Sequence, residues 1–148
     1  MSRIQFPALA SGIFSTELEV YQSLINYGGH LDNALMLTLV SETRARFFKT
    51  LGYTEVDVEG FGIVVADAAV QYLSEAFHGD ILRFTMDAQD FNKYGCDLVY
   101  QGTEIQCGRE VVRGKTGIVF FDYRQRRIHT PPPQFLQRLQ QMRLLQNS

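Results

Sequence analysis

Residues 32–51 carry the strongest structural signal in this chain. Asp32 or Asn33 is a suitable helix N-cap, and Gly52 supplies a stop signal just beyond the last turn, so the stretch predicts a long helix. Its first half has apolar residues on nearly every side instead of along one stripe, which is typical of a helix surrounded by protein. Its second half is amphipathic and basic, so we expect the helix to reach the surface there.

The rest of the chain is rich in strand signals. Alternating polarity predicts a first strand, and runs of β-branched and aromatic residues predict the others. The expected strands cover residues 16–22, 62–73, 80–91, 95–101 and 103–123. Short turns between them favour antiparallel hairpins over parallel crossovers. Prolines that precede a helical repeat within residues 130–146 predict a short terminal helix.

A single helix buried on nearly all sides requires a sheet that curves around it, because a flat sheet covers only one face. The length of 148 residues and the hydrophobic content of 45% suit one continuous core. We therefore predict one α+β domain over residues 1–148, with a curved antiparallel sheet wrapped around a long central helix.

Composition and missing motifs exclude several functional classes. The net charge of -2 argues against nucleic-acid binding, which usually needs a strongly basic face. No apolar stretch approaches the roughly 20 residues that cross a bilayer, and the first residues lack a secretory signal pattern, so we expect a cytoplasmic protein without membrane contact. Cys96 and Cys107 have no CxxC spacing or nearby histidine pair and are interpreted as reduced thiols with no metal site. No P-loop, GxGxxG or GxSxG pattern occurs.

The segment VYQSLINYGGHLDNALMLTLVSETRARFFKTLGY resembles the hallmark region of hot-dog-fold acyl-CoA thioesterases of the hydroxybenzoyl-CoA thioesterase-like group. The matching residues are Gly29, His30, Asn33, Ala34, Arg44, Leu51 and Gly52. Further on, VVADAAVQYLSEAFHGDILRFTMDAQ is similar to the next paired strands of that family, with Tyr72 and the Gly79-Asp80 pair in the expected places. The resemblance implies a hot-dog fold and hydrolysis of acyl-CoA without a dissociable cofactor. It also implies homodimers or homotetramers whose active sites are shared between subunits.

One position departs from the family pattern. Many members carry an acidic residue four positions before the histidine of Gly-His, where it acts as base or nucleophile, but this chain has Asn26 there. An amide cannot accept a proton at neutral pH, so that role fails at this residue. Asn26 can still orient a water molecule or donate to the substrate carbonyl, or it can simply be a turn residue.

The backbone at Gly29 and His30 is the first candidate for contact with substrate. Free N–H groups and the positive end of the helix dipole are expected to meet there and to stabilise the oxyanion formed from a thioester carbonyl. The alternative is a tight turn with no catalytic role. The His30 side chain suits proton exchange near neutral pH, but it can equally serve only to fix the turn.

Other groups are weaker candidates. Glu42 and Thr38 lie on one side of the expected helix and are candidates to replace the missing acid. An ion pair between Glu42 and Arg46, four residues on, is the simpler role for this glutamate. His78 lies in a loop that can reach the site of a partner subunit, or it is only solvated. Among the strand cations, Arg83, Lys93, Arg109, Arg113 and Lys115, some are candidates for binding CoA phosphates.

The sequence therefore predicts a homo-oligomeric acyl-CoA thioester hydrolase. The rival interpretation is a hot-dog protein that binds acyl-CoA or acyl-carrier protein and has lost hydrolysis together with the carboxylate at position 26. A dehydratase of similar fold is a third and weaker option. Met36, Leu39 and Phe47 fit an acyl pocket and core packing equally well, so the acyl group stays undefined.

Overall fold

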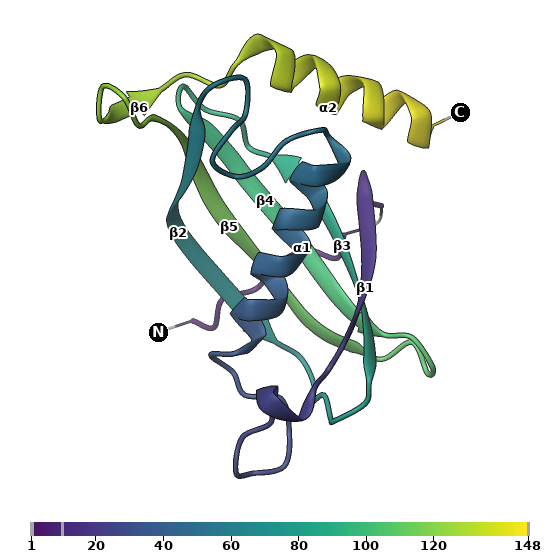
Figure 1. Cartoon of the computed structure of the whole chain (residues 1–148). Coiled ribbons are helices and arrows are strands. Elements are labelled where there is room, and N and C mark those ends of the chain that lie inside the picture. Colours follow the sequence, from purple (N-terminus) through teal and green to yellow (C-terminus); the bar gives the residue numbers. More distant parts are fainter. Residues whose placement is uncertain (1, 10, 148) are drawn as a thin grey trace.

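The computed structural model describes residues 2–9 and 11–147, and one six-stranded antiparallel sheet dominates it (Figure 1). The strands are β1 (Phe14–Glu19), β2 (Gly62–Tyr72), β3 (Ile81–Gln89), β4 (Gly95–Glu104), β5 (Glu110–Asp122) and β6 (Arg127–His129). They are arranged in the order β1-β3-β4-β5-β2, and β6 pairs with the end of β5. Each expected strand has a counterpart, but the last one starts only at Glu110, because residues 103–104 continue β4 and residues 105–109 form the connection; β6 is an additional short strand.

Strict alternation of side chains gives the sheet one apolar face. In β3, Leu82, Phe84 and Met86 are fully buried, whereas Arg83 between them is exposed. The same period continues through β4 and β5, as expected for strands with one buried face. A register shift in β2, between Val65 and Asp67, marks a bulge that bends the strand.

Helix α1 (Met36–Thr50) lies along the concave apolar face of the sheet (Figure 1). Its buried residues are Met36, Leu39, Val40, Thr43, Phe47 and Phe48. The opposite side of the helix is open in the single chain, and Leu37 is 40% exposed there. The prediction of a helix covered on nearly every side is therefore wrong for one chain alone, because the sheet covers only the face turned toward it.

The helix also begins four residues later than predicted. Asp32 starts a short turn instead of the helix itself, and its carboxylate accepts hydrogen bonds from the N–H groups of Ala34 (3.0 Å) and Leu35 (3.2 Å). The Asp32 carbonyl then accepts from the Met36 N–H at 3.0 Å, which opens the helix. Neither Asp32 nor Asn33 is therefore the N-cap of α1: that position is Leu35, which makes no capping side-chain hydrogen bond, and Asp32 caps the preceding turn instead. At the other end, Gly52 has the positive φ of 91° that a C-terminal stop requires.

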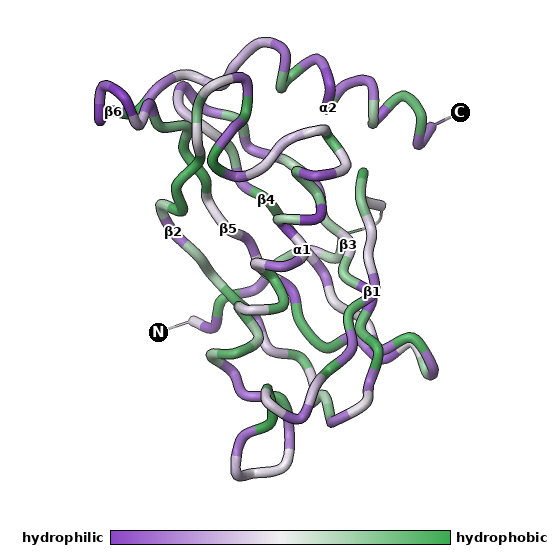
Figure 2. The backbone as a smooth tube through the Cα atoms, viewed as in Figure 1, coloured by the Kyte–Doolittle hydropathy of each residue, from purple (hydrophilic) through white to green (hydrophobic). Residues whose placement is uncertain are grey.

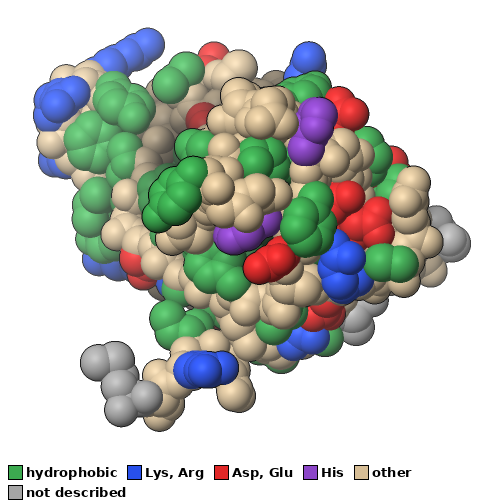
Figure 3. All heavy atoms as spheres, turned by 90° about the horizontal axis from the view of Figure 1, so that it is seen from below, with side chains coloured by type: hydrophobic (Ala, Val, Ile, Leu, Met, Phe, Trp, Pro, Cys, Tyr) green, Lys and Arg blue, Asp and Glu red, His purple; other side chains and the backbone are tan. Residues whose placement is uncertain are grey.

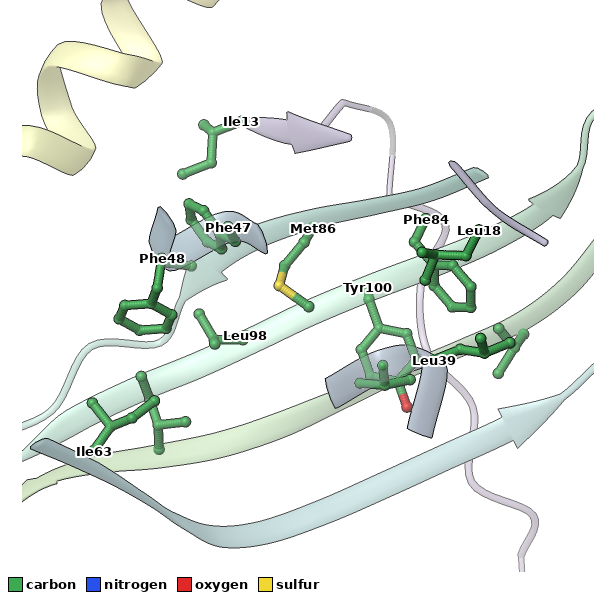
Figure 4. Close-up of a cluster of buried hydrophobic side chains, with 14 of the residues drawn as sticks. Ile13, Leu18, Leu39, Phe47, Phe48, Ile63, Phe84, Met86, Leu98 and Tyr100 are labelled. Carbon is green, nitrogen blue, oxygen red and sulfur yellow. The ribbon is translucent and has the colours of Figure 1, made fainter. Parts of the chain in front are cut away.

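The core fills the space between α1 and the sheet (Figure 4). Helix α2 (Pro133–Gln146) confirms the expected terminal helix and closes one end of this core with Phe135 and Leu139. The 3₁₀ helix η1 (Gln22–Leu24) follows β1 at the opposite end, where the first strand was expected to continue. In the described residues, no helix combines the length and apolarity that crossing a membrane requires.

Candidate functional site

The loop between η1 and α1 is held by its own backbone. The Asn26 N–H donates to the His30 carbonyl, and the Gly29 N–H donates to the Asn26 carbonyl, both at 3.0 Å. The Asn26 side-chain oxygen accepts from the Gly28 N–H at 2.9 Å. Gly29 has a φ of 87°, which only glycine adopts without strain. Asn26 and Gly29 therefore build the turn, and the Gly29 N–H already has an acceptor.

His30 points its imidazole back over this turn. Its Nδ1 lies 3.2 Å from the Leu31 carbonyl oxygen, and because a carbonyl can only accept, Nδ1 is assigned the proton. In the neutral ring, Nε2 then carries the lone pair. This atom lies 3.9 Å from the Glu75 carboxylate, which reaches it from the segment after β2.

A pocket of about 330 Å³ lies between the start of α1 and the segment that follows β2. It is lined by His30, Leu31, Asp32, Asn33, Met36, Tyr72, Leu73, Ser74, Glu75 and Ala76. Figure 3 views this end of the molecule, where histidine side chains lie among hydrophobic and acidic ones. The pocket thus combines an apolar interior with an imidazole, a carboxylate and backbone groups, which is the usual composition of a small-molecule site.

Two amide groups at the mouth of the pocket have no internal partner. Within residues 2–9 and 11–147, neither the His30 N–H nor the Asn33 N–H has a hydrogen-bond acceptor, whereas the Ala34 and Leu35 amides are occupied by Asp32. Of the two backbone donors expected to bind the substrate, Gly29 donates its N–H to the Asn26 carbonyl, so only the His30 N–H is unpaired. Asn33 supplies a second unoccupied N–H, close to the positive end of the helix dipole.

The two walls of the pocket are fastened to the rest of the fold. The Tyr72 hydroxyl donates to the Asn33 carbonyl at 2.6 Å, which ties the end of β2 to the turn before α1. Burial, and then the nearby Asp32 carboxylate, raise the pKa of Tyr72, so this phenol stays protonated and keeps donating. Arg109 donates to the Ser74 hydroxyl at 3.2 Å and to the Glu75 carbonyl at 2.9 Å. These contacts hold Glu75 opposite His30.

Thr38 and Glu42 are not brought into this pocket. They lie on the open side of α1 and line a separate surface groove with Leu37, Ser41 and Ala45. Glu42 forms an ion pair with Arg46 at 2.7 Å, which is the simpler role considered for it. Within one chain, neither side chain reaches the His30 imidazole.

The remaining candidates have ordinary roles in the single chain. His78 is exposed in the loop before β3. The strand cations are engaged with neighbouring groups: Arg83 with Glu17, Lys93 with the Tyr94 ring, Arg109 with Asp80, Arg113 with Glu110, and Lys115 with Asp67 and Asp97. Both cysteines are free, and burial followed by the charge of Asp97 raises the pKa of Cys96 to about 12, so its thiol is inert at neutral pH. The described residues hold no group of three side chains suited to a metal ion.

Sequence reasoning did not find Glu75 or the structural role of Arg109. Glu75 follows directly after an expected strand, in the stretch LSEAF, and nothing in that local pattern distinguishes it from a solvated loop acid. The pairing with His30 depends on two segments that are 45 residues apart and meet only in the folded chain.

An antiparallel sheet curved around one long helix, with a pocket at the helix start, defines the hot-dog fold, and the solved structures most like this one agree. The 1,4-dihydroxy-2-naphthoyl-CoA thioesterase of Synechocystis superposes with a TM-score of 0.77 at 16% identity, covering 85% of this chain and 94% of that one. A Staphylococcus aureus protein solved in complex with CoA gives 0.79 at 19% identity, covering 93% and 87%. A DHNA-CoA thioesterase of the same organism gives 0.77 at 17%, covering 90% and 92%. These identities are low, so the likeness shows the fold.

The chain belongs to the thioesterase-like superfamily, whose family model matches residues 20–139. This match confirms the family resemblance that the Gly29-His30 region and the strands after it indicated. No curated protein sequence is a significant match.

Proposed function

We propose that this protein hydrolyses acyl-CoA thioesters in the pocket between the start of α1 and the segment after β2. Membership of the thioesterase-like superfamily supports this activity in general terms. Two of the similar structures are described as CoA thioesterases, and a third holds CoA. The observation that carries the proposal is the His30 imidazole, whose Nε2 makes no hydrogen bond in the described residues and which lines a pocket that also has two unpartnered amides.

His30 replaces the missing carboxylate as the general base. Its Nε2 accepts a proton from water while the water oxygen bonds to the thioester carbonyl carbon. The C–S bond then breaks, and the imidazolium returns that proton to the leaving CoA thiolate, which yields a free carboxylic acid and the CoA thiol. Glu75 lies 3.9 Å from this same nitrogen, and its negative charge favours the imidazolium that forms there.

The oxyanion of the tetrahedral intermediate is stabilised by backbone donors. We assign the unpartnered N–H groups of His30 and Asn33 to this role, together with the positive end of the α1 dipole. Because both donors belong to the folded backbone, they need no rearrangement during the reaction. The reaction requires no dissociable cofactor, and we expect it to take place in the cytoplasm.

Asn26 favours one alternative, a protein that binds acyl-CoA or acyl-carrier protein without hydrolysis. Its amide oxygen accepts a hydrogen bond from the Gly28 N–H within the turn, and an amide cannot take a proton from water at neutral pH. Under this alternative, the pocket holds the thioester but the water is never activated.

Thiol release from a panel of acyl-CoA thioesters separates the two functions. We expect the wild-type protein to release CoA thiol, and we expect Asn26→Asp to change that rate modestly, within about tenfold, because His30 already supplies the base. A silent wild type combined with an active Asn26→Asp variant would instead establish the binding function. The assay reads free thiol continuously, and the same mixture without protein serves as the blank.

We also propose that the working form is a homodimer paired along β2. In the described chain β2 has β5 as its one partner strand, and Val65 is 50% exposed beside the exposed Ala66 and Ala68. Figure 2 shows hydrophobic residues along much of this edge. A long apolar edge strand is a template for pairing with another chain. Pairing two copies there would also help to cover the open side of α1.

Ala68→Glu should convert the dimer to a monomer. Residues near the twofold axis of a symmetric interface meet their own copies, so the substitution places two carboxylates close together in an apolar contact. Ala68 is exposed in the single chain, so the fold itself should tolerate the change. Sedimentation velocity measures the outcome, with Leu144→Glu as the control, since Leu144 is 63% exposed near the C-terminal end of α2 and outside β2. Equal dissociation by both variants, or by neither, would contradict the proposed interface.

A further inference from the structure

The segment before β1 crosses the outer face of the sheet, which is the face turned away from α1 (Figure 1). The Phe6 N–H donates to the Gln71 side chain of β2 at 2.9 Å, and the Phe6 carbonyl accepts from Arg113 of β5 at 2.8 Å. The Leu9 N–H donates to the Gln101 side chain of β4, also at 2.9 Å. Side chains from three neighbouring strands therefore hold one short segment in place.

These three side chains lie in a single row across the sheet. Gln101 is opposite Arg113 in the ladder between β4 and β5, and Arg113 is opposite Gln71 in the ladder between β5 and β2. The segment thus runs perpendicular to the strands, from β2 toward β4 along the chain. Because β2 is the edge strand on that side, the residues that precede Phe6 in this direction leave the sheet of their own chain.

Residues 2–5 form an arm at this edge. All four are exposed, and Ile4 is 55% exposed. Within residues 2–9 and 11–147, the arm makes no hydrogen bond or ion pair, so its course is fixed only at its base by Phe6. Figure 1 shows the chain before β1 passing behind the sheet and continuing past β2.

The proposed β2 pairing places a second copy next to this arm. Two copies of one strand related by a twofold axis pair antiparallel. With the axis near Ala68, and with the extra residue of the β2 bulge left unpaired, Gln71 is opposite the partner's Val64. Within one chain Val64 is opposite Val119 of β5, and both are half-buried on the outer face. The row that holds the segment therefore continues onto two valines of the second copy.

The arm is long enough to reach these valines. Adjacent strands lie about 4.8 Å apart, and an extended chain advances about 3.3 Å per residue. Ile4 is two positions from Phe6 in the sequence, so it extends about 7 Å beyond Gln71. That distance places Ile4 between the partner's Val64 and the partner's Val119.

We propose that residues 2–5 are a dimerisation arm, which binds the outer face of the second copy across the partner's Val64 and the partner's Val119. The inference rests on the dimer of the proposed function and adds a second contact to it. The two β2 strands pair edge to edge, and each arm covers part of the other sheet. Burial of Ile4 against the valines removes apolar surface of both copies from water, and the twofold axis repeats this contact.

Ile4→Asp tests the arm through the strength of dimerisation. The substitution places a carboxylate against the valines in both symmetric contacts, so the dimer Kd should rise by about tenfold or more. The circular dichroism spectrum should not change, since Ile4 is exposed in the single chain. Sedimentation velocity over a concentration series measures Kd. Leu144→Asp is the matched control, because it makes a similar change at a residue that is 63% exposed on α2, and it should leave Kd unchanged.

Cross-linking between two different chains tests where the arm binds. One chain carries Ile4→Cys and the other Val64→Cys, both in a Cys107→Ser background that removes the exposed native thiol. After co-expression, a short bismaleimide should join the two into a covalent heterodimer. Leu136→Cys in place of Val64→Cys is the control, since Leu136 is exposed on α2, and it should give no such product.

The outcomes separate this inference from the proposed dimer. A wild type that sediments as a monomer at every concentration would refute both. A dimer that Ala68→Glu dissociates, but whose Kd is unchanged in Ile4→Asp or whose arm gives no cross-link to Val64→Cys, would overturn the arm alone. Thiol release from acyl-CoA is a separate readout, so failure of the proposed hydrolysis alters neither result.

Discussion

Replacing His30 with glutamine should lower kcat/KM for thioester hydrolysis by about 10²–10⁴-fold, the usual contribution of a general base. The substitution removes the Nε2 lone pair that faces Glu75, while the His30 backbone N–H stays in place as an oxyanion donor. The loss should therefore appear mainly in kcat, with KM nearly unchanged.

His78→Gln provides the control for this substitution. His78 is exposed in a loop and does not line the pocket, so His78→Gln makes the same chemical change outside the site. The activity of this variant should match that of the wild type. Full activity in His30→Gln would contradict the mechanism and direct attention to Glu75 as a base that acts on water directly. In that case Glu75→Gln, instead of His30→Gln, would abolish thiol release.

The fold was largely predictable because its signals are local and periodic. The alternation that buries Leu82, Phe84 and Met86 is visible in the sequence, and so is the stop signal at Gly52. The predicted start of α1 was too early because the Asp32 carboxylate caps a turn that precedes the helix. An aspartate that caps a turn cannot be distinguished in the sequence from one that caps a helix.

The extent of burial around α1 was harder to predict. Apolar residues such as Ala34 and Leu37 suggested a helix enclosed by its own sheet, but both are exposed in one chain. An apolar pattern predicts that a residue is buried, but it does not indicate whether the same chain or a second chain buries it. The exposed apolar edge of β2 and the open side of α1 are accounted for together if a second copy provides the cover.

The candidate site was predicted only in part, since its chemistry depends on pairing between distant segments. The Gly29-His30 turn was recognisable from its residues, yet the use of the Gly29 N–H inside that turn was not, because backbone hydrogen bonds leave no trace in composition. Glu75 reaches His30 only through the fold, which brings the segment after β2 next to the start of α1. Reasoning from local patterns cannot supply that pairing.

Phe135→Ala should lower the free energy of unfolding by about 3–5 kcal/mol, the typical cost of truncating a buried phenylalanine. Phe135 is 1% exposed, and its ring lies 5.9 Å from that of Phe48 and 5.0 Å from that of Phe120, so it joins α2 to both α1 and the sheet. For a domain of this size the loss corresponds to a Tm lower by roughly 10 °C. Urea denaturation at 25 °C measures the free energy directly.

Leu136→Ala is the matched control, because the neighbouring Leu136 lies on the same helix but is 40% exposed, and it should cost less than about 1 kcal/mol. Figure 1 places α2 at the opposite end of the sheet from the 25–31 loop, so Phe135→Ala should keep its wild-type kcat/KM at temperatures where it stays folded. Similar stability of the two variants would show that α2 is not docked as described. A large loss of kcat/KM in folded Phe135→Ala would show instead that the helix communicates with the pocket, since stability and catalysis would then depend on the same contact.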